Sequence, residues 1–382
     1  MVMSDTWAVL FGGPSPEHEI SILTGLQSER VLTASGETVQ PIYWAPAGGW
    51  FLVPSGTEAK DYLDGVPAGS RPVEVRLGGN AGLYVKKRFG EVSLEPGAVL
   101  VCLHGGIGEG GGAAAVFTLL GIPATGSSLF AGAVGMDKLA FGGLMGTAGI
   151  PSLPRELLSA TREPSFAGPY IVKPRFGGSS IGIEIVEDLE TARAIAKASV
   201  HLRAGAVLEP YRPELVDLNI AFRTHPTLEV TQLERPLRGE STGGLYSYAE
   251  KYLAGSSGAD AGLTSAPREL PANVPDAVAS MAAALAARVA EVTGLTGVVR
   301  VDLLLDEESG ELFVNEVNSI PGAMSLYLWA PQAAAAQVLK DALVEARDAR
   351  PALPTSGFGS GAALRAAGGI AGKLVGLDGP RG

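Results

Sequence analysis

Apolar runs separated by polar turns repeat along the chain and predict a mixed α/β protein. Short apolar runs predict buried strands, and apolar residues at helical spacing predict helices. The predicted strands are 7–11, 98–103, 170–174, 183–186, 206–211, 217–223 and 228–234. The predicted helices are one that ends near Leu32, and 113–120, 129–146, 189–197 and 276–295.

The strongest prediction in this pattern is a β-hairpin within residues 297–322. Residues 298–305 and 312–318 alternate between apolar and polar positions, as strands with one buried face do. A tight acidic turn with Gly310 near its end joins them. The helix over 276–295 is expected to pack behind the hairpin through one stripe, formed by Val278, Met281, Leu285, Val289 and Val292.

Polar side chains gather on one face of this hairpin. Arg300 and Asp302 share a face of the first strand, and Glu316 and Asn318 share a face of the second. Pairing the strands should bring all four together, beside a Pro-Gly turn that offers backbone N–H groups. Two carboxylates and an amide oxygen suit Mg²⁺, which completes its shell with water and substrate phosphates. The alternative is an ordinary amphipathic hairpin with a wet outer face.

A glycine-rich loop follows the strand at 98–103. Gly106, Gly108 and Gly111 match the spacing of a dinucleotide-binding loop between a strand and a helix. Such a loop requires an acidic residue about 20 positions further on, and nothing acidic occurs between Glu109 and Asp137. An NAD-dependent oxidoreductase therefore remains a minority hypothesis, beside a loop that approaches a small substrate.

A second flexible loop follows the strand at 170–174. Lys173 lies near the end of that strand, and the glycine- and serine-rich residues 175–182 come next. A cation at a strand end followed by such a loop suits a cover for phosphate groups. A surface turn is the alternative.

Length and charge narrow the class of protein. A chain of 382 residues with 46% hydrophobic content predicts two or three domains with full cores. The net charge of −11 argues against a nucleic-acid partner but leaves room for a local phosphate pocket. Cys102 is the only cysteine and is expected in a buried strand. No signal peptide or membrane span is predicted, so we expect a cytoplasmic protein.

Seven segments together resemble the D-alanine–D-alanine ligase family of the ATP-grasp superfamily. In chain order they are LFGGPSPEHEIS, LHGGIGEGGG, GIPATGSS, MDKLA, IVKPRFGGSSIG, YAEKYL and VVRVDLLLDEESGELFVNEVNSIPG, and the similar region that contains them is residues 7–332. Each is weak evidence alone, but seven in the family's order identify the chain as a member. The resemblance implies an α/β (α+β) three-domain ATP-grasp fold. The expected units are an N-terminal α/β substrate domain (1–127), a central ATP-grasp subdomain (128–208), a C-terminal catalytic domain (209–350) and a Gly/Ala-rich disordered tail (351–382).

The resemblance implies an ATP-dependent amino-acid ligase. ATP's γ-phosphate would pass to a substrate carboxylate, and the amine of a second amino acid would attack the resulting acyl phosphate. The default product is D-alanyl-D-alanine for peptidoglycan. The implied cofactors are ATP and two Mg²⁺ ions, with Mn²⁺ as a substitute. The implied partners are small amino acids and a second copy of the chain in a homodimer, with neither nucleic acid nor membrane.

The resemblance also assigns roles to individual residues. It implies that the metal ions are bound by Asp302, Glu316 and Asn318. It implies that ATP is bound by Lys138, Lys173, Glu209 (adenine side), Asp217 (ribose) and Lys251. It directs Arg300 and the Gly322 N–H to the oxyanion of the tetrahedral intermediate, where one such donor contributes on the order of 3–4 kcal/mol.

The remaining implied roles concern the two amino-acid substrates. Glu17 would hold the ammonium of the first substrate, and Ser179 and Tyr252 would complete its hydrogen-bonded triad. That triad would tie loops over the site and keep water from the acyl phosphate. His104 would line the substrate pocket, and Ser325 would contact the carboxylate of the second substrate.

Three departures from the family's motifs change these expectations. Gly110 replaces a carboxylate of the glycine-rich loop, and the hairpin ends in Glu-Val-Asn-Ser instead of Glu-Ala-Asn-Thr. After Gly322 the Ser-Leu-Tyr motif arrives about two residues early, and Leu328-Trp329 replaces the usual proline. The acceptor pocket should therefore differ. A biosynthetic ligase with another acceptor is the first alternative, and a non-catalytic nucleotide-binding relative is a further one.

Overall fold

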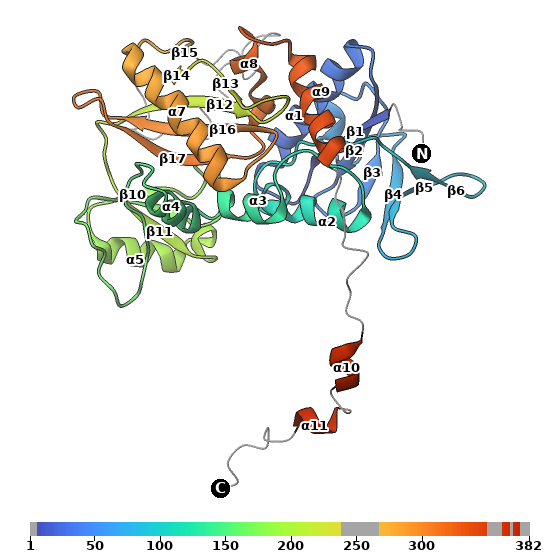
Figure 1. The fold of residues 1–382 in the computed structure, drawn as a ribbon, viewed down its shortest axis with the longest axis horizontal. Helices are drawn as coiled ribbons and strands as arrows, with labels where there is room; N and C mark the ends of the chain where they lie inside the picture. The colour runs from blue at the N-terminus through green and yellow to red at the C-terminus, as the bar shows by residue number, and fades with distance from the viewer. Residues whose placement is uncertain (1–5, 238–266, 350–360, 367–369, 375–382) are drawn as a thin grey trace.

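The computed structural model describes residues 6–237, 267–349, 361–366 and 370–374. These residues form three main sheets with helices packed around them (Figure 1). The helices are α1 (His18–Ala34), α2 (Ala113–Leu120), α3 (Leu129–Met136), α4 (Lys138–Thr147), α5 (Leu189–Ala198), α7 (Asp276–Thr293), α8 (Leu326–Trp329), α9 (Ala335–Ala349), α10 (Ala362–Ala366) and α11 (Ala371–Leu374). Short helical turns are η1 (Ala59–Tyr62), η2 (Gly108–Gly112), η3 (Val200–Leu202) and η5 (Gly322–Ser325).

A seven-stranded sheet organises the N-terminal part of the chain, in the order β6-β5-β4-β3-β2-β1-β7. Its strands are β1 (Thr6–Gly12), β2 (Thr38–Trp44), β3 (Trp50–Leu52), β4 (Arg71–Arg76), β5 (Gly82–Lys86), β6 (Glu91–Leu94) and β7 (Val99–Val101). Strand β1 runs parallel to both β2 and β7. The segments after β1 and β7 therefore leave the sheet at the same edge, which brings Glu17 and His104 to one end of this unit.

The core under this sheet also takes side chains from the far end of the sequence. Trp329 from α8 and Leu339 and Leu343 from α9 are buried in the same hydrophobic cluster as β1 and β7. Helix α9 thus packs on the N-terminal core, against β7 and beside α1 (Figure 1). The division of the chain at residues 127, 208 and 350 stays a proposal.

Two four-stranded sheets form the rest of the body. The order of the first is β10-β9-β11-β8 and that of the second is β13-β12-β16-β17, with a small β14–β15 pair beside it. The strands are β8 (Glu156–Leu157), β9 (Tyr170–Pro174), β10 (Glu184–Val186), β11 (Ala206–Pro210), β12 (Val216–Arg223), β13 (Glu229–Val230), β14 (Arg235–Pro236), β15 (Arg268–Glu269), β16 (Val298–Leu305) and β17 (Leu312–Asn318).

The predicted hairpin is present as β16 and β17, with the expected bounds. The predicted apolar face of β16 is buried through Val299, Val301, Leu303 and Leu305. Its polar positions are partly exposed, so the alternation does separate two faces. Asp302 lies opposite Glu316, and Arg300 lies opposite Asn318. Helix α7 packs behind the hairpin, but the predicted stripe is wrong at Met281, which is 46% exposed. Ala282 takes the buried position instead, because the helix packs through small residues there.

The predicted helix over 129–146 is broken into α3 and α4 at Asp137. This residue has an extended backbone (φ −83°, ψ 100°), and its side chain accepts hydrogen bonds from the N–H groups of Leu139 and Ala140. Arg175 holds the same carboxylate through contacts of 2.8 and 2.6 Å. The aspartate thus caps a new helix, and Lys138 becomes its first residue.

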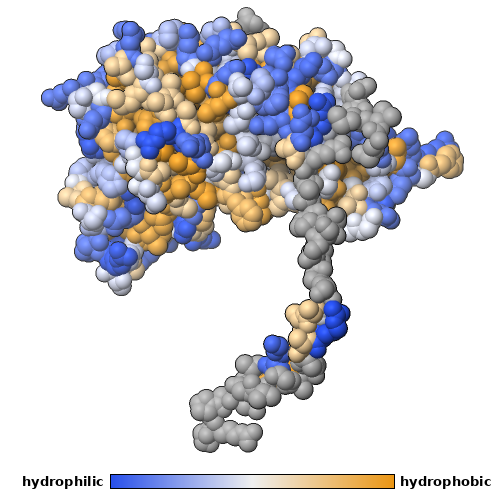
Figure 2. All heavy atoms as spheres, viewed as in Figure 1, coloured by the Kyte–Doolittle hydropathy of each residue, from blue (hydrophilic) through white to orange (hydrophobic). Residues whose placement is uncertain are grey.

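On the face drawn in Figure 2, hydrophobic residues are interspersed among hydrophilic ones. Among the described residues, no helix is both long and apolar enough to cross a membrane.

Candidate active site

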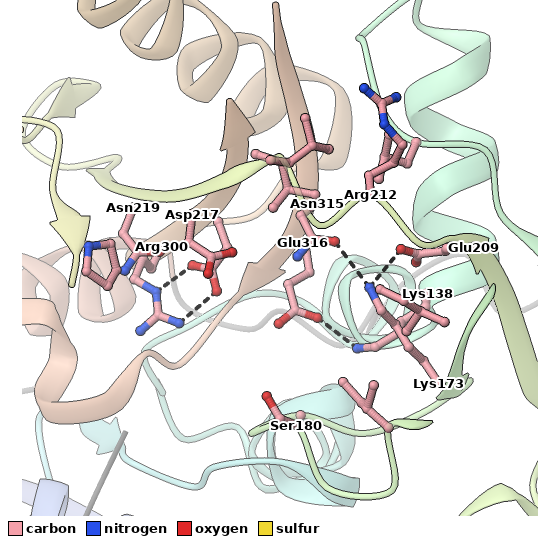
Figure 3. A pocket seen from close by; sticks show the side chains of 18 of the residues that line it. Lys138, Lys173, Ser180, Glu209, Arg212, Asp217, Asn219, Arg300, Asn315 and Glu316 are labelled. Carbon is pink, nitrogen blue, oxygen red and sulfur yellow. Dashed lines mark hydrogen bonds and ion pairs between the residues drawn. The ribbon is translucent and has the colours of Figure 1, made fainter. Parts of the chain in front are cut away.

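The main pocket lies between the two four-stranded sheets. Lys173 and Glu209 reach it from β9 and β11, while Asp217, Arg300 and Glu316 reach it from β12, β16 and β17. Figure 3 shows Glu316 between a group with Arg300 and Asp217 on one side and a group of lysines with Glu209 on the other. Side chains assigned to metal and to nucleotide therefore meet in one cavity.

The carboxylate of Asp302 lies among polar groups of the hairpin. Arg300 grips it with two nitrogens, Nε at 2.6 Å and Nη2 at 2.9 Å. The amide nitrogen of Asn318 donates to it at 3.1 Å. Three of the four side chains expected to converge are thus in direct contact, since strand register places them on one face.

The carboxylate of Glu316, by contrast, is held by Lys138. The lysine Nζ donates to Glu316 Oε2 at 2.9 Å and to the carbonyl of Gly177 at 2.7 Å. Lys138 is buried with only 8% of its surface exposed, because α4 begins deep in the site. It therefore ties the hairpin to the glycine- and serine-rich loop.

The donor set fits a magnesium ion that completes its shell from a substrate. Among the described residues, no group of three or more His, Cys, Asp and Glu side chains is arranged to hold a metal by itself. Two carboxylates and the amide oxygen of Asn318 leave further positions for water and phosphate oxygens, as Mg²⁺ prefers. A cation bound there would replace Lys138 and Arg300 as the partner of the carboxylates.

A second buried ion pair lies at the other end of the pocket. Lys173 Nζ donates to Glu209 Oε2 at 2.7 Å, and Glu209 is 1% exposed. Arg155 Nε lies 3.1 Å from the other carboxylate oxygen, an ion pair without the angle of a hydrogen bond. Burial alone raises the pKa of Glu209, but Lys173 and Arg155 outweigh it and the net pKa is lowered. Glu209 is thus ionised between two cations.

Of the two remaining predicted nucleotide contacts, Asp217 is among the described residues and Lys251 is not. Asp217 lies on β12 opposite Leu304 and lines the pocket beside the hairpin. Lys251 and Tyr252 lie outside the described residues. Their predicted roles stay predictions.

Glu17 and Ser179 meet across a long sequence separation. The Ser179 hydroxyl donates a hydrogen bond to Glu17 Oε1. Ser179 has φ 53°, in the left-handed region that few residues other than glycine adopt. The loop after β9 thus bends over the end of the N-terminal sheet, and both side chains are buried.

His104 is buried just past β7. Its Nε2 pairs with the hydroxyl of Thr24 at 2.8 Å, and the same hydroxyl accepts the N–H of Ala323 at 3.0 Å. Burial lowers the pKa of His104 to about 4, so the ring is neutral near pH 7. The histidine thus links the N-terminal sheet to the turn after β17 and is not a cation.

The side chain of Glu109 is hydrogen-bonded to the backbone of its own glycine-rich loop. Its carboxylate accepts hydrogen bonds from the N–H groups of Gly105 (2.8 Å) and Ile320 (3.2 Å). Burial and the nearby Glu17 raise its pKa to about 7. Because the Gly105 N–H already donates to Glu109, the loop is not arranged around a pyrophosphate. Gly111, at φ 96°, serves a tight turn against Leu129.

The turn after the hairpin is tight. Ala323, Met324 and Ser325 all have φ near 50°, and each residue in this left-handed region costs roughly 1–2 kcal/mol. Ser325 is fully buried, and its hydroxyl has no hydrogen-bond partner among the described residues. It does not line the main pocket, so its contact with the second substrate stays a prediction, as does that of the Gly322 N–H.

Sequence reasoning missed three residues that hold this site together: Arg155, Glu109 and Thr24. Arg155 follows a proline in an irregular segment, and no periodicity points to its burial. Thr24 lies on a helix face with no motif of its own. Glu109 could have been found, because a lone carboxylate in a run of glycines has few other partners than backbone N–H groups.

Comparisons with known proteins agree with this geometry. The family model described as D-ala D-ala ligase N-terminus matches residues 6–127, and that described as D-ala D-ala ligase C-terminus matches residues 134–346. A D-alanine–D-alanine ligase of Methylobacterium sp. (strain 4-46) is 31% identical over 88% of this chain and 90% of its own. One of Kineococcus radiotolerans is 33% identical over 85% of this chain and 91% of its own.

A solved structure extends the likeness to three dimensions. The D-alanine–D-alanine ligase of Coxiella burnetii superposes with a TM-score of 0.73 and 20% identity, over 91% of this chain and 95% of that one. The fold is therefore the ATP-grasp fold expected from the sequence. The motifs, the convergent pocket and the relatives lead to one conclusion: the chain belongs to the D-alanine–D-alanine ligase family, and as a member it is an ATP-dependent, ADP-forming ligase.

Proposed function

We propose that the protein joins two amino acids in a peptide bond, with D-alanyl-D-alanine for peptidoglycan as the default product. The observation that carries the proposal is that Lys138, Lys173, Asp302 and Glu316 line one pocket, in which Lys138 pairs with Glu316 and Lys173 with Glu209. Cations for phosphate oxygens and carboxylates for a divalent cation are the parts that phosphoryl transfer needs. ATP supplies the phosphoryl group that activates the first substrate's carboxylate as an acyl phosphate.

The metal requirement proposed here is two Mg²⁺ ions, which Mn²⁺ can replace. Asp302, Glu316 and Asn318 would hold them together with phosphate oxygens. When bound, these ions neutralise charge on the transferring phosphoryl group. Arg300, which pairs with Asp302 in this structure, would direct its guanidinium to the oxyanion when Asp302 holds the metal.

The first amino acid would bind between the N-terminal sheet and the loop after β9. Glu17 offers a buried carboxylate for its ammonium group, and Ser179 keeps that carboxylate oriented. His104 is neutral and donates or accepts without adding charge beside the substrate. Tyr252, from outside the described residues, would complete the triad and help to exclude water.

The second amino acid would meet the turn that starts at Gly322. The three left-handed residues that follow it support the expectation of an altered acceptor pocket. A related ligase with an acceptor other than D-alanine is therefore the second candidate within the same chemistry. An oxidoreductase has no such support, because Glu109 occupies the backbone donor of the glycine-rich loop.

The setting of the reaction follows from the family alone. A ligase that makes a peptidoglycan precursor would work in the cytoplasm, and the family suggests a homodimer. Sedimentation of the purified protein would test the second point, since a monomer at micromolar concentration would remove it.

The experiment that tests the function uses the purified protein with Mg²⁺ and ATP. Single amino acids and pairs are supplied, and released phosphate, ADP and dipeptide are measured by mass spectrometry. The proposal predicts stoichiometric ADP, phosphate and dipeptide with a productive pair, D-alanine included. No ATP turnover with any amino acid would support the non-catalytic binding protein instead.

A further inference from the structure

Arg155 is a buried arginine that reaches three elements of the site at once. Its side chain is 3% exposed. Nη1 donates to the carbonyl of Lys138 at 3.3 Å, and Nη2 donates to the carbonyl of Asn315 at 2.7 Å. The first carbonyl belongs to the start of α4, and the second belongs to β17, directly before Glu316.

The aliphatic part of the Arg155 side chain packs so closely against Gly142 that only a glycine leaves room for it. A Cβ added to Gly142 would lie 2.4 Å from Arg155 Cδ, closer than atoms can approach. The guanidinium then emerges beside Glu209, with Nε 3.1 Å from Oε1. The arrangement is therefore built into the packing of α4.

The carboxylate of Glu209 pairs with two cationic side chains, Lys173 and Arg155, and only one of them can move away from it. Lys173 Nζ, at 2.7 Å, ends a flexible side chain and lies in the pocket. Arg155 is anchored by its two carbonyl contacts and cannot turn away. A buried carboxylate without a counter-cation is strongly unfavourable. If Lys173 alone balanced Glu209, moving it to a phosphate would leave that carboxylate uncompensated.

We propose that Arg155 is a positioning residue that keeps Glu209 ionised and in place, and thereby lets Lys173 move from Glu209 to the phosphates of the nucleotide. The inference rests on the proposed role of Lys173 at ATP and extends it to a residue outside the family's motifs. Arg155 itself touches no substrate. It acts by balancing the charge of Glu209 after Lys173 has moved away.

The test measures the Kd of Mg²⁺–ADP and of a non-hydrolysable ATP analogue by calorimetry. Arg155→Gln removes the charge but keeps an amide donor for a carbonyl, and Arg155→Lys keeps the charge. The expected result is nucleotide binding weaker by at least about tenfold in Arg155→Gln, and within about threefold of the parent in Arg155→Lys. Arg193→Met, which removes a surface cation paired with Glu163 in the same sheet unit, is the matched control and should bind as the parent does.

A double-mutant cycle separates this role from general support of the fold. In a Glu209→Gln background there is no charge to balance, so Arg155→Gln should weaken nucleotide binding by no more than about twofold. Equal effects in both backgrounds would overturn the proposal, as would equal binding by Arg155→Lys and Arg155→Gln. If Arg155→Gln does not fold, Arg155→Met against Arg155→Lys makes the same comparison of charge. Failure of the proposed function would look different, because the parent itself would then bind no nucleotide.

Discussion

Lys138 donates a hydrogen bond to Glu316 at 2.9 Å, so a side chain predicted for phosphate and a side chain predicted for metal hold each other in this structure. Lys173 and Glu209 repeat the arrangement at 2.7 Å. The charges proposed to bind ATP and Mg²⁺ are thus paired with each other in this structure. Binding of both ligands would exchange these contacts and so would link metal binding to nucleotide binding.

Glu316→Gln should reduce turnover strongly while leaving the fold intact. The amide keeps the shape of the side chain but removes a charge from the proposed Mg²⁺ ligands, so phosphate release should fall at least about a hundredfold. Glu311→Gln, at an exposed position of the same hairpin, is the control. Phosphate release near the parental rate in Glu316→Gln would remove this residue from the metal site.

Ser179→Ala should loosen the coupling between ATP use and peptide formation. The variant loses the hydrogen bond to Glu17, so the loop after β9 should close less firmly over the acyl phosphate and admit water. The ratio of phosphate to dipeptide should rise above one. Tyr252→Phe is predicted to behave in the same way. A ratio unchanged in both variants would count against the closure role, whatever happens to the rate.

Glu109 should make the stability of the unliganded protein depend on pH. Its pKa rises from 4.5 to about 7 on folding, so the native state binds the proton more tightly than the unfolded state does. The contribution of Glu109 to the free energy of unfolding is therefore largest below pH 4.5. It is lost as the pH rises through 7, by on the order of 3 kcal/mol. Glu109→Gln cannot ionise, and so should lose less stability than the parent between pH 5 and pH 8 in denaturant titrations. Parallel curves would contradict this assignment.

The tight turn after β17 should reduce the fit of D-alanine as the second substrate. A buried carboxylate that finds no hydrogen-bond partner costs several kcal/mol, and the hydroxyl of Ser325 is turned into the core. Inserting two residues after Met324 should shift acceptor preference toward D-alanine, measured as kcat/KM for competing acceptors. Efficient D-alanyl-D-alanine synthesis by the unaltered protein, with larger acceptors rejected, would show the inference to be wrong.

Local patterns predicted much of the fold, because strand alternation and glycine-rich turns are visible in the sequence. The hairpin of Asp302 and Glu316 is the best case, since alternation predicts which residues share a face. A β-bulge between Asp302 and Leu303, which the alternation does not reveal, sets Asp302 opposite Glu316. The prediction of one helix over 129–146 was wrong because Asp137 caps a new helix, and Arg175, which holds its carboxylate, is distant in sequence. The same reason hid the ion pairs of Lys138 and Arg155, whose partners come together only in the folded chain.

The most direct test of the ligase chemistry follows oxygen atoms from the first substrate. Transfer of the γ-phosphate to a carboxylate places one carboxylate oxygen in the phosphate that leaves when the second amine attacks. With the first amino acid labelled by ¹⁸O in its carboxylate, one ¹⁸O atom should appear in each phosphate released, with ADP as the nucleotide product. Unlabelled phosphate, or label in AMP, would contradict activation through an acyl phosphate.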